Sequence, residues 1–109
     1  MQGSTLLERL HALLDAPLYG EGALSVEQIE RTLTDGYALA LALDAERSRL
    51  AKRISQLAAD NGDDAHEKAR ELSSLSQRLA ETHGELSLLR RSLATVRRRS
   101  AELRAAALA

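Results

Sequence analysis

A run of regularly spaced leucine-type residues between residues 72 and 107 constrains this chain most. Apolar side chains recur there at alternating steps of three and four residues, and only two positions in the rhythm are polar, Thr82 and Ser100. The apolar stripe consists of Leu72, Leu75, Leu79, Leu86, Leu89, Leu93, Val96, Leu103 and Ala107. This spacing, held over about five heptads, is typical of an α-helix that buries one narrow face against another helix. The sequence therefore predicts a long helix that needs a helical partner.

A second stripe with the same spacing supplies that partner. It consists of Val26, Ile29, Leu33, Ala40, Leu43, Leu50, Ile54 and Leu57. Ser25 and Gln28 have the spacing of a capping box, which places the start of this helix at residue 26. Gly36 could mark a break, a bend or a close helix contact, but the stripe keeps its phase on both sides, which favours an unbroken helix. Arg47 also interrupts the stripe, either extending its charge outward or forming a polar layer that fixes the register.

The two stripes are separated by a short turn. We expect the second helix to span 26–60, the turn 61–63, and the third helix 64–108. Asp64 and Glu67 have capping-box spacing at the start of the third helix. A turn this short places consecutive helices side by side and antiparallel. The predicted fold class is therefore all-α, an antiparallel helical hairpin of the coiled-coil type.

The distribution of charge supports this hairpin independently of the leucines. Residues 1–46 carry eight acidic residues and two arginines, whereas residues 85–109 carry six arginines and two acidic residues. Folding the chain back near Gly62 lays the acidic segment beside the basic one. In the resulting register the predicted pairs are Glu30 with Arg97, Asp44 with His83, Glu46 with Arg78, and Arg53 with Glu71. Such exposed pairs select orientation and register, while the leucines supply the stability.

A short first helix is expected over 4–15, followed by a loop over 17–24 that contains the single proline. Thr5 and Glu8 have capping-box spacing, and the helix presents an apolar face of Leu6, Leu10, Leu13 and Leu14. Further apolar side chains lie off the two long stripes, at Tyr37, Leu39, Leu41 and Leu88. Either the first helix covers them, which makes a three-helix bundle at the terminal end, or a second copy covers them in a dimeric four-helix bundle. These eight residues are the predicted contacts for a partner or for self-association.

The composition excludes several classes of function and favours others. Tyr19 and Tyr37 are the only aromatic residues, and cysteine is absent, so base-stacking platforms and disulfides are excluded. No apolar run approaches the about 18 residues of a membrane span. The first leucines follow no basic segment of the kind that opens a signal peptide. We therefore expect a soluble, cytoplasmic protein, and we interpret the excess of arginine over lysine as that of a GC-rich bacterial genome.

Three clusters were considered as binding or catalytic sites. In the arginine-rich stretch, Arg90, Arg97 and Arg104 are expected to neutralise the acidic helix, which leaves Arg91, Arg98 and Arg99 as possible contacts for an anion. The acidic residues near Gly62 lack the spacing of a calcium loop and are explained by a capped turn. The histidines, His11, His66 and His83, have no partner at metal-binding spacing. No catalytic triad is recognisable, and we expect neither a metal, nor a cofactor, nor an enzyme.

The sequence thus favours a non-enzymatic interaction or scaffolding module built on a helical hairpin. Its partner is expected to be another protein or a second copy of the chain, in a homodimer. The alternative is an architectural nucleic-acid-binding protein that uses the arginine stripe near the C-terminus. Nucleic-acid binding is disfavoured because the chain has a net charge of −1 and lacks stacking aromatics.

Overall fold

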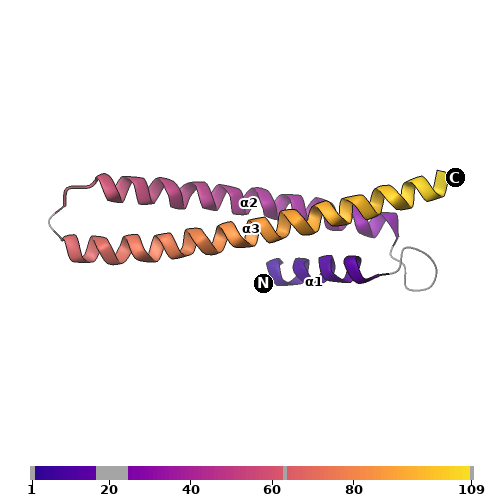
Figure 1. The fold of residues 1–109 in the computed structure, drawn as a ribbon, viewed down its shortest axis with the longest axis horizontal. Coiled ribbons are helices and arrows are strands. Elements are labelled where there is room, and N and C mark those ends of the chain that lie inside the picture. Colours follow the sequence, from indigo (N-terminus) through magenta and orange to yellow (C-terminus); the bar gives the residue numbers. More distant parts are fainter. Residues whose placement is uncertain (1, 17–24, 63, 109) are drawn as a thin grey trace. The chain divides into compact units, whose positions relative to one another are not determined.

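The computed structural model describes residues 2–16, 25–62 and 64–108, with side chains from Leu6 onward. These residues form three helices in the order α1 (Gln2–Asp15), α2 (Val26–Ala59) and α3 (Ala65–Leu108), and no strand occurs among them (Figure 1). The predicted all-α class and the helical hairpin are confirmed. The loop expected over 17–24 lies outside the described residues.

Capping side chains define where α2 and α3 begin. At α2, the Ser25 hydroxyl accepts a hydrogen bond from the Gln28 amide at 3.1 Å, and the Gln28 side chain accepts one from the Ser25 amide at 2.9 Å. This reciprocal pair is the predicted capping box. At α3, Asp64 Oδ1 accepts a hydrogen bond from the Glu67 amide at 2.9 Å, which makes Asp64 the N-cap.

The other two helix ends differ from expectation. Because α1 begins at Gln2, Thr5 lies inside the helix and does not occupy the N-cap position predicted for it. After α2, the Gly62 amide donates to Asp60 Oδ1 at 3.2 Å, and Gly62 does not adopt the left-handed conformation. The Lys68 ammonium of α3 donates to the Asp60 carbonyl oxygen. Asp60 and Lys68 thus supply hydrogen bonds at the C-terminal end of α2.

The chain packs as two units, each of which includes part of both long helices. We call Leu41–Ser87 the hairpin unit, and Met1–Ala40 with Leu88–Ala109 the terminal unit. α2 and α3 each run through both units. The single helical domain expected over 1–109 stays a prediction.

The hairpin unit contains a thin apolar core between antiparallel segments of α2 and α3. Its members are Leu50, Leu57 and Leu75, with Ile54, Leu72 and Leu79 packed against them. Two predicted ion pairs cross between the helices: Arg53 with Glu71 at 3.1 Å and Glu46 with Arg78 at 3.9 Å. Both pairs are centred on residue 62, so the register predicted near the turn is confirmed.

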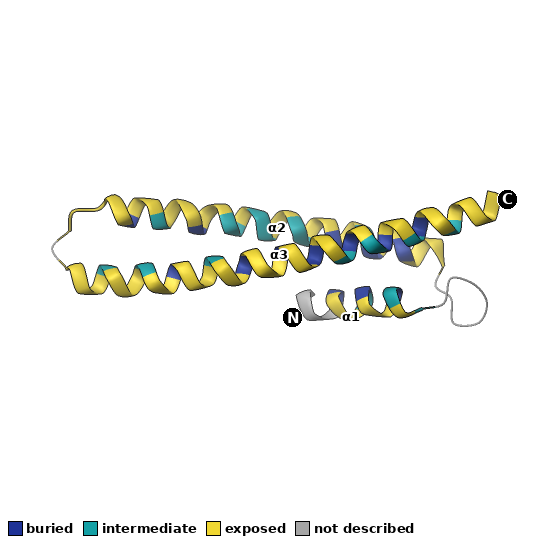
Figure 2. Ribbon diagram, in the orientation of Figure 1, coloured by how far each residue is buried: buried dark blue, intermediate teal, exposed yellow. Residues whose placement is uncertain are grey.

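The terminal unit is a three-helix bundle. Its buried side chains are Leu6, Leu10 and Leu13 from α1, Ile29 and Thr32 from α2, and Leu89, Leu93, Val96 and Ser100 from α3 (Figure 2). Leu10 has no exposed surface at all. The first helix therefore packs in the terminal unit as expected, but it does not cover Tyr37, Leu41 and Leu88, which are 42%, 73% and 61% exposed.

The two polar positions in the α3 stripe remain on its buried face. Thr82 and Ser100 are each only 6% exposed. Residues three and four positions apart lie on the same face of a helix. A polar residue at that spacing from buried leucines is therefore buried with them. The stripe therefore keeps its phase through both positions.

The register predicted for the terminal unit is wrong at Glu30. Its carboxylate pairs with Arg104, two turns beyond the predicted partner Arg97. This pair is centred on residue 67 rather than residue 62. An exposed ion pair contributes only about 0–1 kcal/mol, so charge pairing does not hold the register near the turn against the packing of the helix ends.

Arg47 forms an ion pair with Asp44 on the same helix, α2. Its Nη2 and Nε atoms donate to Asp44 Oδ1 at 2.7 Å and 3.2 Å, and both residues are half-buried. Arg47 therefore pairs along its own helix, and the contact predicted between Asp44 and His83 stays a prediction.

Gly36 allows a close approach of α2 and α3 inside an unbroken helix. It is buried, and a Cβ atom at this position would overlap Leu93 Cδ2, which is itself buried in the terminal unit. Gly84 of α3 is exposed, and a Cβ atom there would meet nothing within 4 Å. Of the three roles considered for Gly36, the close helix contact is the one observed.

We expect opposite effects from alanine at these two glycines. Gly84→Ala should raise the free energy of unfolding by about 0.5–1 kcal/mol, because it restricts the unfolded backbone and meets no neighbour. Gly36→Ala has the same backbone benefit, but overpacking against Leu93 costs about 1–3 kcal/mol, so a net loss is expected. Urea denaturation followed by circular dichroism measures both.

The Leu93→Ala background supplies the control. With the overlapping methyl group removed, Gly36→Ala should become stabilising, as Gly84→Ala is. Equal stabilisation by both glycine substitutions in the wild-type background would contradict the close approach.

Candidate functional site

The surface on which α1 docks is the best-defined feature of the terminal unit. α1 has 14 residues, with no acidic residue in its first turn and no basic residue in its last. A helix of this length is marginal in water, and this one lacks the charges that complement a helix dipole. Its helical state therefore depends on what α2 and α3 provide: an apolar surface for its leucines, acceptors for Arg9 and a cation for the carbonyls of its last turn.

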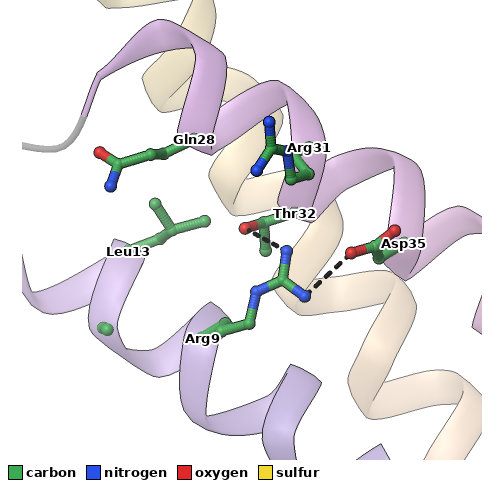
Figure 3. A pocket seen from close by; sticks show the side chains of 7 residues that line it. Arg9, Leu13, Gln28, Arg31, Thr32 and Asp35 are labelled. Atoms are coloured by element: carbon green, nitrogen blue, oxygen red, sulfur yellow. Dashed lines mark hydrogen bonds and ion pairs between the residues drawn. The ribbon is translucent and has the colours of Figure 1, made fainter. Parts of the chain in front are cut away.

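Arg9 connects α1 to α2. Its Nη1 atom donates to Asp35 Oδ2 at 2.9 Å and its Nη2 atom donates to Thr32 Oγ1 at 3.1 Å. Figure 3 shows the guanidinium reaching from α1 toward both acceptors on α2. Because Thr32 is buried, this hydrogen bond satisfies a hydroxyl that would otherwise be costly to bury. Arg9 therefore fixes the position of α1 along α2.

Arg99 connects α3 to the end of α1. Its Nη1 atom donates to the carbonyl oxygens of Leu13 at 3.0 Å and Ala16 at 3.2 Å, and the contact is partly buried. These carbonyls belong to the C-terminal turn, where a helix has unpaired acceptors and a partial negative charge. Arg99 therefore provides, from another helix, the C-terminal cation that α1 lacks.

An open groove runs along the seam between α1 and α2. Its volume is about 420 Å³, and it is lined by Arg9, Ala12, Leu13, Gln28, Arg31, Thr32 and Asp35. The Nη2 atom of Arg31 lies 3.5 Å from Oε1 of Glu27 on the same helix. The lining contains no histidine or cysteine to act as a base or nucleophile, and the Thr32 hydroxyl is engaged by Arg9. The groove is therefore an open seam of mixed polar and apolar lining between the two helices.

The predicted contact residues fall into two groups. Leu6, Leu10 and Leu13 are buried inside the terminal unit, and Leu14 and Leu39 are half-buried. Tyr37, Leu41 and Leu88 are 42%, 73% and 61% exposed. The structure thus brings the α1 leucines together in a core and leaves the others at the surface of α2 and α3.

The three arginines predicted as anion contacts also separate. Arg91 and Arg98 are exposed on α3, and Arg98 lies 3.5 Å from the Thr95 hydroxyl. Arg99 is half-buried and is engaged by the α1 carbonyls. Arg104, predicted to neutralise the acidic helix, does so through Glu30.

The remaining candidates form no cluster. His11, His66 and His83 are exposed on separate parts of the chain. Within residues 2–16, 25–62 and 64–108, no group of three or more His, Cys, Asp or Glu side chains is arranged to hold a metal ion. Over the same ranges, no helix combines the length and apolar character required to cross a membrane.

Comparisons of the chain with models of protein families, with curated proteins and with solved structures gave no match.

Sequence reasoning did not identify Arg9 and Arg99 as the residues that hold α1. For Arg9, the available signal was charge, because the first part of α2, against which the first helix was expected to pack, is mainly acidic. For Arg99, the signal was the lack of any basic residue in the last turn of α1, which requires a cation from elsewhere.

Removing the Arg99 guanidinium should destabilise the docking of α1. For Arg99→Gln we expect the free energy of unfolding to fall by about 1–2 kcal/mol, because two charge-assisted hydrogen bonds to helix-end carbonyls are lost from a partly buried site. The adjacent Arg98→Gln is the matched control, and it should change the free energy by no more than about 0.5 kcal/mol. Thermal or urea unfolding distinguishes them, and equal effects of the two substitutions would show that the carbonyl contact contributes nothing.

Proposed function

We propose that this chain is a non-enzymatic helical module that acts through protein–protein contacts and associates with a second copy of itself. The observation that carries the proposal is the exposure of Tyr37, Leu41 and Leu88, which remain at the surface although α1 buries its own leucines. Tyr37 and Leu41 lie one turn apart on α2, so they share one face of that helix.

The thin core of the hairpin unit adds support. One apolar cluster of this unit has six side chains, three of them only partly buried, and Leu86 of the same unit is 2% exposed. A two-helix arm with so little buried apolar surface gains stability when another helix covers it, and self-association supplies that cover. The same surface would serve a different protein partner, and the partner's identity is a matter for experiment.

An acidic substitution on the exposed face of α2 should weaken self-association. We expect Tyr37→Glu and Leu41→Glu each to raise the dissociation constant of the dimer tenfold or more, since a buried interface does not tolerate an unpaired carboxylate. Ala38→Glu adds the same charge at an exposed position next to Tyr37 and should have little effect. Sedimentation equilibrium measures the constants, and a wild-type chain that stays strictly monomeric at high micromolar concentration contradicts the proposed self-association.

Binding of nucleic acid ranks second, and the exposure of Arg91 and Arg98 favours it. Against it, Arg99 and Arg104 make contacts inside the terminal unit. Phosphate-driven binding is strongest at low salt and weakens steeply as salt is added.

A titration with duplex and single-stranded oligonucleotides at low salt tests this second candidate. If it is right, the affinity should fall several-fold when Arg91 and Arg98 are both replaced by glutamine, whereas Tyr37→Glu should leave it unchanged. No measurable binding by the wild-type chain at low salt removes this candidate.

A further inference from the structure

α1 is recognised by a surface made entirely by the other two helices. Leu6, Leu10 and Leu13 enter the apolar interior of the terminal unit, and Leu10 is completely covered. The polar contacts specify the position: Asp35 and Thr32 of α2 receive Arg9, and Arg99 of α3 reaches the carbonyls at the end of α1. The surface therefore contacts both the side chains of α1 and the carbonyl groups at its C-terminal end.

α1 lacks the features that stabilise a helix in isolation, and its position depends on contacts with α2 and α3. It has no acidic first turn and no basic last turn, and its length is below that of a helix stable alone. The seam with α2 contains an open groove, so this side of α1 is not fully enclosed. Leu7, on α1, is an exposed apolar residue. Segments with such properties are those that open locally while the rest of a protein stays folded.

When α1 leaves its surface, the buried hydroxyl of Thr32 loses its partner Arg9, and the apolar interior that encloses Leu6, Leu10 and Leu13 is opened. The occupant whose chemistry fits this surface is already known, because the chain's own α1 is bound there with every contact described above. A second copy presents an identical helix. Residues 16–25 connect α1 to α2, and a chain of that length spans up to about 30 Å when extended, so the connection permits docking on a neighbour.

We propose that α1 is an exchangeable helix: it docks on the terminal unit of a second copy through the contacts that it makes with its own, and two chains associate by reciprocal exchange. The intramolecular and exchanged forms have the same contacts, so concentration decides between them through the effective concentration that the connection imposes. This interface differs from the exposed face of Tyr37 and Leu41, and the proposal does not depend on that face.

The Arg9–Asp35 pair allows a direct test by charge reversal in full-length chains. In Arg9→Glu, residue 9 meets Asp35 of the same chain with like charge; in Asp35→Arg, Arg9 meets residue 35 with like charge. When the two variants are mixed, reciprocal exchange gives two opposite-charge contacts in each mixed dimer: Glu at 9 with Arg at 35, and the native Arg9 with the native Asp35. Light scattering measures the mass of each variant alone and of the equimolar mixture.

We expect the mixed dimer to have a dissociation constant roughly tenfold or more below that of either variant alone, because two contacts are relieved together. The single chain that carries both reversals restores its pair internally and should behave as the wild type. Far-UV circular dichroism on each variant verifies that α2 and α3 are folded.

A matched control uses the Arg53–Glu71 pair of the hairpin unit, which also joins two helices across a partly exposed contact. Mixing Arg53→Glu with Glu71→Arg should give no mixed dimer above the level of the separate variants, because exchange of α1 does not relieve that pair. If the mixture of the Arg9 and Asp35 variants has only the average mass of its two components, exchange is overturned. Mixed dimers formed equally by the control mixture overturn it as well. If the wild type still dimerises and Tyr37→Glu abolishes the dimer, the failure of exchange leaves the proposed function intact.

Discussion

The apolar contact between the facing stripes of α2 and α3 is the constraint on which the other features depend. Each stripe is one helical face wide, so neither helix can bury its leucines alone. The contact between them provides a surface for α1, which has no stable helical state of its own. Leu10 of α1 and Leu89 and Val96 of α3 illustrate the dependence, because all three are almost fully buried in the terminal unit although α1 and α3 lie far apart in the sequence.

Residue spacing made the helices and their buried faces predictable. Steps of three and four residues identify a face whatever the side chain, which is why Thr82 and Ser100 are buried although they are polar. Capping was predictable at Ser25 and Asp64 because the acceptor and the amide are three residues apart and need no tertiary information. It was not predictable after α2, where Lys68 reaches back from the next helix to the Asp60 carbonyl oxygen.

Charge pairing was predictable only near the turn. Around residue 62 the connection restricts how far the helices can slide, and the pairs at Arg53 and Glu46 lie where a simple register places them. At Glu30 that restriction has weakened, and Arg97 and Arg104, one heptad apart, both face the acidic helix. Since an exposed pair contributes only about 0–1 kcal/mol, helix packing selects which arginine is used. The close approach at Gly36 is one such packing feature, and no charge pattern would have located it.

The arginines show why residue type alone did not assign a function to this chain. Arg104 neutralises an acidic residue of another helix, Arg47 pairs along its own helix, and Arg99 binds helix-end carbonyls. A guanidinium has five donors on a long side chain, so its partner depends on which acceptors lie within reach in the folded chain. The number of arginines in a sequence cluster is therefore the largest number that a basic surface could present. Each arginine bound by an internal acceptor, such as the end of α1, lowers that number. In this chain that reduction weakens the case for an anion-binding stripe, which is why the proposed self-association rests on the exposed apolar side chains.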